Sequence, residues 1–150
     1  MIPQLPAALV DYLVEQTCVI QQIPAPTFHE ERRAAYLLNE FIRLGLKDCQ
    51  IDAAGNVLAR WPGEKDLPVI ISAHLDTVHP LATPLTLQRD EVHLIGPGVG
   101  DNSLGLATLL ALGRLFSESG APYPGDIWLI GNICEEGQGN LVGMKAIVER

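Results

Sequence analysis

The stretch LPVIISAHLDTV, residues 67–78, contains the most clearly predicted strand of the chain. Its centre, from Val69 to Ile71, is apolar at consecutive positions, as in a central strand whose two faces are both covered. The strand then runs into two polar residues, His74 and Asp76. In layered α/β proteins, functional sites lie at the carboxyl ends of such strands. The stretch therefore predicts a covered sheet and also the place where a site is to be sought.

Segments with helical and extended patterns alternate along the rest of the chain. Apolar residues at helical spacing predict helices over 6–20, 28–44 and 101–119, and a further helix from about Gly139 to the end at Arg150. Other patterns predict two short strands around Gly55-Asn56, a hairpin around Arg89-Asp90 and a buried strand over 126–134. This order predicts an α/β fold of three layers, in which helices cover a mostly parallel, mixed sheet.

The second predicted helix has recognisable start and stop signals. Thr27 and Glu30 stand three residues apart after a proline-rich break, which is the pattern of a capping box. Gly45 follows the last apolar residue of the helix and is a natural C-terminal stop.

The composition is typical of a folded, soluble protein, with 47% hydrophobic and 19% charged residues among 150. The net charge is −8 without a basic cluster, so no nucleic-acid partner is expected. No apolar run approaches the roughly 20 residues that cross a bilayer, and the N-terminus lacks the basic lead-in of a signal peptide, so no membrane partner is expected. Three widely spaced cysteines do not suggest a disulfide framework, which predicts a reducing, cytoplasmic location.

His74 and Asp76 form the first candidate cluster. They lie two residues apart at a strand end, so both side chains are expected on one face. Neutral imidazole is the commonest zinc ligand, and a nearby carboxylate often fixes the orientation of a ligand His. The alternative is a purely structural His–Asp pair. His79, slightly further on, is expected in a loop or at the rim of a substrate site.

The glycine-rich stretch GPGVGDNSLG, residues 96–105, precedes the long third helix. It loosely resembles a dinucleotide-binding fingerprint, which keeps a nucleotide-binding α/β protein among the alternatives. Asp101 stands where the fingerprint has its final Gly, and a carboxylate there competes with a phosphate for the positive end of the helix. Asp101 is therefore interpreted either as a helix N-cap or as a bridge between two cations.

Glu135 and Glu136 lie in NICEEGQGN, residues 132–140, directly after the second buried strand. Adjacent carboxylates repel each other, and neighbours on an extended chain point in opposite directions. A turn here brings both toward one site in different roles, whereas the alternative is an exposed acidic turn. One His, two Asp and two Glu thus gather at the ends of predicted strands, and divalent cations prefer such a ligand set.

In this order and spacing, SAHLDTVHP, GPGVGDNSLG and NICEEGQGN resemble a family of metallopeptidases. The family includes tripeptide aminopeptidase, glutamate carboxypeptidase, acetylornithine deacetylase and succinyl-diaminopimelate desuccinylase. The similarity covers essentially the whole chain but less than half of a typical member. It implies a zinc-exopeptidase-like fold and a metal-dependent hydrolase of peptide or N-acyl amino-acid amide bonds.

The resemblance also implies a role for each of five residues. His74 ligates one metal ion, Glu136 ligates the other, and Asp101 bridges the two. Asp76 orients His74, and Glu135 is the general base that acts on the metal-bridging water. The implied cofactors are two zinc ions, and cobalt or manganese suits the same ligands.

With these ligands, each metal ion is one short of the usual three from protein. The family supplies the others from an acidic residue shortly beyond the Glu pair and from a late His, and neither His29 nor His93 matches that motif. Residues 1–150 are therefore expected to be the N-terminal portion of a two-metal hydrolase catalytic domain, without its lid or dimerisation domain and C-terminal part. Such a portion, from a truncation or a split gene, is expected to be nearly inactive and to self-associate through an unpaired sheet edge.

A non-catalytic α/β interaction module is a further alternative. Such a module would retain the fold after losing the rest of a catalytic domain. Its motifs should then have decayed, yet all five site residues are present in the expected types. The sequence therefore favours the hydrolase over the interaction module.

Overall fold

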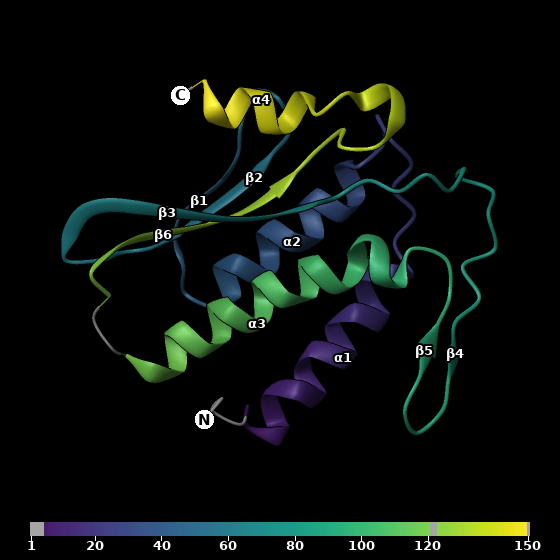
Figure 1. Ribbon diagram of the computed structural model, residues 1–150, viewed down its shortest axis with the longest axis horizontal. Coiled ribbons are helices and arrows are strands. Elements are labelled where there is room, and N and C mark those ends of the chain that lie inside the picture. Colours follow the sequence, from purple (N-terminus) through teal and green to yellow (C-terminus); the bar gives the residue numbers. More distant parts are fainter. Residues whose placement is uncertain (1–4, 121–122, 150) are drawn as a thin grey trace.

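The computed structural model describes residues 5–120 and 123–149, whose strands form a mixed sheet (Figure 1). The spatial order of its strands is β1 (Lys47–Ile51), β2 (Val57–Trp61), β6 (Gly125–Asn132) and β3 (Lys65–His74). β3 runs parallel to β6, whereas β2 is antiparallel to both β1 and β6. The mixed sheet is confirmed, but the described strands are not mostly parallel, since β3 and β6 form their one parallel pair. β1 and β2 are joined by a short turn, which makes them antiparallel neighbours.

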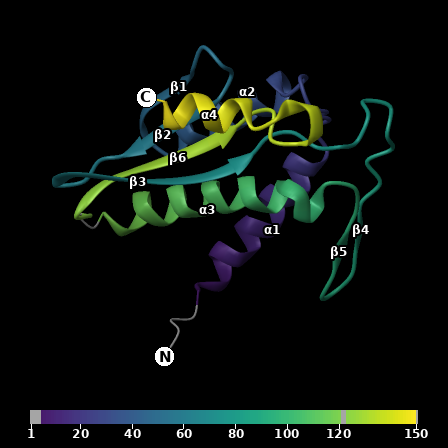
Figure 2. The ribbon, with the colours of Figure 1, turned by 45° about the horizontal axis from the view of Figure 1, so that its top comes forward.

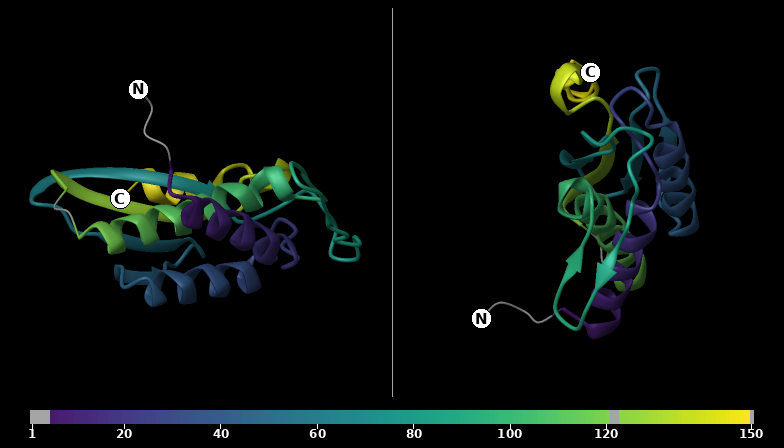
Figure 3. Two further views of the ribbon diagram at one scale, coloured as in Figure 1. Left: turned by 90° about the horizontal axis from the view of Figure 1, so that it is seen from below. Right: turned by 90° about the vertical axis from the view of Figure 1, so that its right-hand side faces the viewer.

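Helices cover both faces of the sheet (Figure 2). One face carries α1 (Ala7–Gln21), α2 (Glu31–Arg43) and α3 (Leu104–Ser119), and the other carries α4 (Val142–Val148) (Figure 3). The main core lies under the three long helices, and a smaller apolar cluster joins Ile147 of α4 to Leu58 and Ile130 of the sheet. The three predicted layers are therefore present. The predicted end of the last helix, Arg150, lies outside the described residues.

Both predicted turns between short strands are confirmed. β1 and β2 form an antiparallel pair around Gly55-Asn56. A separate hairpin, β4 (Gln88–Arg89) with β5 (Leu94–Ile95), extends away from the sheet (Figure 1). None of the described helices is long and apolar enough to cross a bilayer.

The position of β3 differs from the expectation of a central strand. Within the described residues it pairs with β6 alone and lies at the edge of the sheet. Val69 and Ile70 are consequently 55% and 52% exposed. An apolar run indicates that both faces of a strand can be covered by helices. It does not determine the position of the strand in the sheet, which depends on the segments that pair with that strand.

The capping box predicted for α2 is wrong. Glu30 occupies the N-cap position, but no side chain caps this helix. The Thr27 hydroxyl instead donates to the Asp76 carboxylate at 2.9 Å, and the Glu30 carboxylate accepts a hydrogen bond from the Cys134 amide at 3.0 Å. The side chains of Thr27 and Glu30 therefore bond to residues distant in sequence and do not cap α2. The predicted stop at Gly45 agrees with the end of α2 at Arg43, and Gly45 has a positive φ of 78°.

Candidate active site

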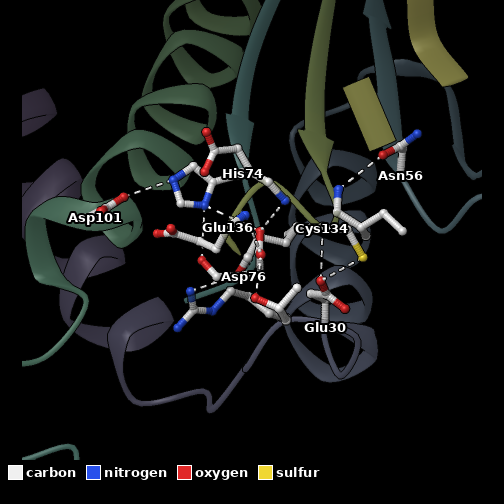
Figure 4. A network of polar contacts seen from close by, with 12 residues as sticks. Glu30, Asn56, His74, Asp76, Asp101, Cys134 and Glu136 are labelled. Carbon is white, nitrogen blue, oxygen red and sulfur yellow. Dashed lines mark hydrogen bonds and ion pairs between the residues drawn. The ribbon is translucent and has the colours of Figure 1, made fainter. Parts of the chain in front are cut away.

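The site forms where β3 and β6 end side by side. His74 and Asn132, the last residues of these strands, face each other in register, and the Leu75 amide donates to the Asn132 carbonyl at 2.7 Å. The chain therefore leaves both strands at the same end of the sheet, although His74 and Asn132 are 58 positions apart in the sequence. Asp101 reaches the same place from η1 (Val99–Ser103), the irregular turn before α3 (Figure 4).

Four of the five predicted site residues converge at this end of the sheet. Donor atoms of His74, Glu135 and Glu136 all lie within 4.8 Å of one another. Asp101 Oδ1 lies 2.9 Å from His74 Nε2. The fifth residue, Asp76, is fully buried behind them. The structure thus brings the three sequence clusters into one site.

The imidazole of His74 is held from both sides. Its Nδ1 lies 3.0 Å from the Asp76 carbonyl oxygen and 3.5 Å from the Asp76 carboxylate, and Nε2 faces Asp101. Burial lowers the pKa of His74, but the hydrogen bond and charge of Asp76, with the charges of Glu135 and Asp101, raise it to about 9. Anchoring of Nδ1 leaves Nε2 as the ring nitrogen that faces the acidic cluster.

Asp76 connects the two strand ends through its buried carboxylate. Oδ1 accepts the Glu135 amide at 3.0 Å, and Oδ2 accepts the Glu136 amide at 3.0 Å and the Thr27 hydroxyl at 2.9 Å. Burial raises the pKa of this carboxyl, but hydrogen bonds with His74, the two amides and Thr27 lower it to about 2. Asp76 is therefore an ionised acceptor that ties the Glu pair to the end of β3.

A turn at Cys134 brings the two glutamates to the same site. Cys134 has a positive φ of 53°, which breaks the extended run of β6 before Glu135 and Glu136. Burial and then the charge of Asp101 raise the pKa of Glu136. Three carboxylates around one imidazole repel each other, and bound cations relieve that repulsion.

The donor set of the site fits divalent metal ions. It offers one imidazole nitrogen from His74 and carboxylate oxygens from Asp101, Glu135 and Glu136. Zinc, cobalt and manganese all accept this mixture of ligands. Glu135 and Glu136 both place a carboxylate oxygen in this group.

The other histidines contribute less to this arrangement. His93 is 64% exposed in the β4–β5 hairpin, where its ring pairs with Asp90. His29 is exposed just before α2. Neither belongs to the group of possible ligands found among the described residues. This agrees with the expectation that neither replaces a missing ligand.

Three residues that support the site had no recognised functional signal in the sequence. In the sequence, Glu30 fits the pattern of a helix cap, and Asn56 fits the pattern of a turn between two strands. Arg33 follows exposed charged residues, yet it is only 2% exposed, and its guanidinium donates to the carbonyls of Leu75 at 2.9 Å and Ile23 at 2.8 Å. Burial lowers the pKa of Arg33 to about 10, and the charge of Asp76 opposes this. No local pattern distinguishes the contacts of these residues with Ile133, Cys134 and Leu75, because those partners are distant in sequence.

A model of peptidase family M28 matches residues 56–150, more than half of the chain. The chain belongs to peptidase family M28. The matched region includes all five predicted site residues. Membership of a peptidase family confirms the resemblance to metallopeptidases that the three motifs indicated.

Individual relatives agree with this family. The cytosol non-specific dipeptidase of Escherichia coli (strain K12) is 33% identical in an alignment 109 positions long, which covers 62% of this chain and 22% of that protein. The crystal structure of aminopeptidase PepT from Bacillus cereus ATCC 10987 matches 91% of this chain with a TM-score of 0.77 and 25% identity. A tripeptidase from Staphylococcus aureus subsp. aureus Mu50 matches 90% with a TM-score of 0.75 and 26% identity. These matches confirm the predicted fold.

The relatives are much longer than the region compared. The chain spans 39% of each of the two solved peptidases and 22% of the dipeptidase. The likeness therefore concerns one part of each relative.

Proposed function

We propose that this chain is the N-terminal portion of the catalytic domain of a dinuclear metallopeptidase that removes residues from small peptides. The observation that carries the proposal is the convergence of His74, Glu135 and Glu136 within 4.8 Å, with Asp101 at 2.9 Å from His74. The names of the relatives, a dipeptidase and a tripeptidase among them, favour short peptides as substrates. N-acyl amino acids are the second substrate class, because their scissile amide bond is of the same kind.

His74, Asp101 and Glu136 are the proposed metal ligands. Asp101 is suited to a shared position because its carboxylate has two oxygens, one of which faces His74. Zinc is the first candidate metal, followed by cobalt and manganese. When bound, such ions lower the pKa of water and polarise the scissile carbonyl.

Glu135 is the proposed general base. Its carboxylate takes a proton from the attacking water as the water oxygen bonds to the scissile carbonyl carbon. The same proton then passes from Glu135 to the leaving amine as the amide C–N bond breaks. Asp76 stays ionised throughout, because its pKa is held at about 2, and it keeps His74 Nδ1 anchored.

The remaining ligands are proposed to come from the part of the enzyme that this chain does not include. Each catalytic zinc usually has three protein ligands, and the residues named above supply two to each. The lid or dimerisation domain and the C-terminal part would also lie in that remainder. The length of the relatives supports this division.

The nucleotide-binding alternative is disfavoured by the position of Asp101. The residue lies just before α3, where a phosphate would bind, and its carboxylate faces His74. The glycine-rich loop thus presents a negative charge at the place where the alternative requires a positive one.

The first prediction tests the separate roles of the two glutamates. In the complete enzyme, Glu135→Gln should reduce turnover of dipeptides and tripeptides by about 10²–10⁴-fold, since a general base contributes that much. The metal content, measured by elemental analysis after dialysis against zinc, should stay near that of the unmodified enzyme. Glu136→Gln should instead lose metal and turnover together.

Gln138→Ala is the matched control, because Gln138 is an exposed residue of the short helix η2 (Gly137–Gly139), which directly follows Glu136. It should retain both turnover and metal content. Loss of metal in Glu135→Gln would show that Glu135 is a ligand and that base and ligand are misassigned. No hydrolysis by the complete, zinc-loaded enzyme would overturn the proposed function.

A further inference from the structure

Four consecutive backbone amides, those of residues 133–136, each donate to a buried side-chain oxygen from elsewhere in the chain (Figure 4). In order along the chain, the acceptors are Asn56 Oδ1 at 3.1 Å, Glu30 Oε1 at 3.0 Å, Asp76 Oδ1 at 3.0 Å and Asp76 Oδ2 at 3.0 Å. We call residues 133–136 the glutamate turn. It ends with Glu135 and Glu136, two of the acidic residues of the candidate site.

The glutamate turn lies just past the last residue of β6 in the sheet. Asn132 is the last residue of β6 to pair with β3. Beyond Asn132, side-chain oxygens accept the backbone amides, as the carbonyls of a neighbouring strand do within a sheet. They come from three separate places: the turn between β1 and β2, the start of α2 and the end of β3.

Glu30 is committed to the glutamate turn rather than to its own helix. Its side chain is buried, with the residue 5% exposed, and accepts from both the amide and the thiol of Cys134, at 3.0 and 3.5 Å, across 104 positions. A buried carboxylate is costly unless hydrogen-bonded, so these contacts account for its burial. The Glu30 side chain does not cap α2, although Glu30 occupies the N-cap position of that helix.

Contacts outside the glutamate turn hold the side chain of Asn56 in place. The residue is fully buried, and its Nδ2 donates to Asp52 Oδ2 at 3.0 Å and to the Gly143 carbonyl at 3.1 Å. These two donations orient the amide so that Oδ1 faces the Ile133 amide. Asn56 thereby links the start of the glutamate turn to the β1–β2 turn and to α4.

We propose that Glu30 and Asn56 are positioning residues that fix the glutamate turn and so set where the Glu135 and Glu136 carboxylates stand. The inference rests on the proposed function for its catalytic consequence. Neither residue is a proposed metal ligand or base, and each acts through a backbone amide. A displacement of about 1 Å of a catalytic group can cost about 10²-fold in rate. Loss of an acceptor should therefore lower kcat more than it raises KM.

Four variants of the complete enzyme distinguish the effect of the Glu30 acceptor on the glutamate turn from effects of its charge and of overall stability. Glu30→Met removes the acceptor at nearly constant volume. Glu30→Gln keeps an oxygen acceptor without the charge, and Glu30→Asp keeps the charge but withdraws the acceptor by one methylene. Glu31→Met is the matched control, because Glu31 is the exposed neighbour at the first position of α2.

The first measurement is amide hydrogen exchange in the metal-free enzyme, resolved to the glutamate turn. Glu30→Met should speed exchange of these amides at least tenfold, whereas the amides of β6 that pair with β3 should change less than twofold. Glu30→Gln and Glu31→Met should exchange like the unmodified protein. Unchanged exchange in Glu30→Met would overturn the proposal. If that variant does not fold, Glu30→Asp carries the same test, because its acceptor is also displaced.

The second measurement is steady-state hydrolysis together with the visible spectrum of the cobalt-loaded enzyme. Glu30→Met should lower kcat about 10–100-fold with KM within threefold, and should shift the cobalt absorption bands because Glu136 moves. Glu30→Gln should restore kcat to within threefold of the unmodified enzyme. Equal damage from Gln and Met would overturn the proposal. If the unmodified enzyme hydrolyses nothing, the proposed function fails, while hydrogen exchange still decides the positioning role.

Discussion

Asp76 accepts hydrogen bonds from three groups in two distant segments, through a carboxylate with no exposed surface. The amides of Glu135 and Glu136 come from the β6 end, and the hydroxyl of Thr27 comes from the segment before α2. Such a buried anion is stable only while these donors and His74 remain in place. At the scale of single residues, the site is therefore organised around an ionised group that is proposed to bind neither metal nor substrate.

The pKa of Asp76 leads to a prediction about acid stability. This pKa is about 2 in the folded protein, below the usual 3.8, so the extra stability is present above pH 3.8 and is lost as the pH falls through about 2. Asp76→Asn removes this titration. In the metal-free enzyme, the advantage of Asp76 over Asn in free energy of unfolding should shrink by about 2 kcal/mol between pH 5 and pH 2.

Denaturant titrations of the two proteins at several pH values provide the measurement. Comparing them cancels the other carboxyl groups, which titrate in both. A difference that stays constant from pH 5 to pH 2 would contradict the assignment of a lowered pKa to Asp76.

At the scale of elements, α4 is placed by a close approach of backbone to the end of β6. The Gly143 amide donates to the Ile133 carbonyl at 3.2 Å, and the Gly143 carbonyl accepts from Asn56. A Cβ added at Gly143 would lie 2.4 Å from Asn56 Oδ1 and 2.5 Å from the Ile133 carbonyl oxygen. Only glycine fits here without movement of α4 or of the glutamate turn.

Gly143→Ala should therefore destabilise the protein, although the same exchange inside a helix is usually favourable. Overpacking costs about 1–3 kcal/mol, which exceeds the gain of about 1 kcal/mol in helix propensity. The midpoint of chemical denaturation should fall accordingly, and hydrolysis by the complete enzyme should fall with it, because Asn56 and Ile133 are displaced.

Lys145→Ala is the control on the same helix, since Lys145 is exposed. Its denaturation midpoint should stay close to that of the unmodified protein. A Gly143→Ala protein that is as stable as the original or more stable would show that the close approach relaxes without cost.

At the scale of the whole molecule, the exposed edge of the sheet is the main feature without a partner in the described residues. β3 presents Val69 and Ile70 there, each more than half exposed. Open edges of this kind pair readily with other strands. In the proposed complete enzyme, further strands of the catalytic domain would cover this edge.

The 150-residue chain on its own should therefore self-associate and hydrolyse little. Light scattering should give a mass above that of the monomer that rises with concentration. Turnover with added zinc should be below about 1% of that of the complete enzyme, since the remaining ligands are proposed to lie outside residues 1–150. Val69→Lys should reduce the association, because a lysine on an edge strand opposes pairing.

Val148→Lys serves as the control, because Val148 is 77% exposed on α4, which packs on Leu58 of β2 and Ile130 of β6. It should leave the association unchanged. A clean monomer at high concentration, or robust hydrolysis by the 150-residue chain, would contradict this account.

Most elements could be predicted from the sequence because their signals are local. The turn at Gly55-Asn56, the hairpin at Arg89-Asp90 and the long third helix depend on neighbours within a few residues. His74, Asp76 and the Glu pair could be predicted to share a site because they stand where two buried strands end, and parallel pairing brings those ends together. Asp101 instead reaches the site from η1, before α3. Thr27 and Glu30 were misassigned because their pattern also fits a helix cap.

The sequence by itself determined the layered α/β class, the metallopeptidase motifs and the five residues His74, Asp76, Asp101, Glu135 and Glu136 as candidates. Only the tertiary structure decided that Glu30, Asn56 and Asp76 hold four successive amides of the glutamate turn. It also decided that β3 lies at an edge among the described strands. Periodicity and turn chemistry act over a few residues, so they predict elements and local turns. The acceptor of a buried amide and the neighbour of a strand are both segments distant in sequence, which only the fold brings within hydrogen-bonding distance.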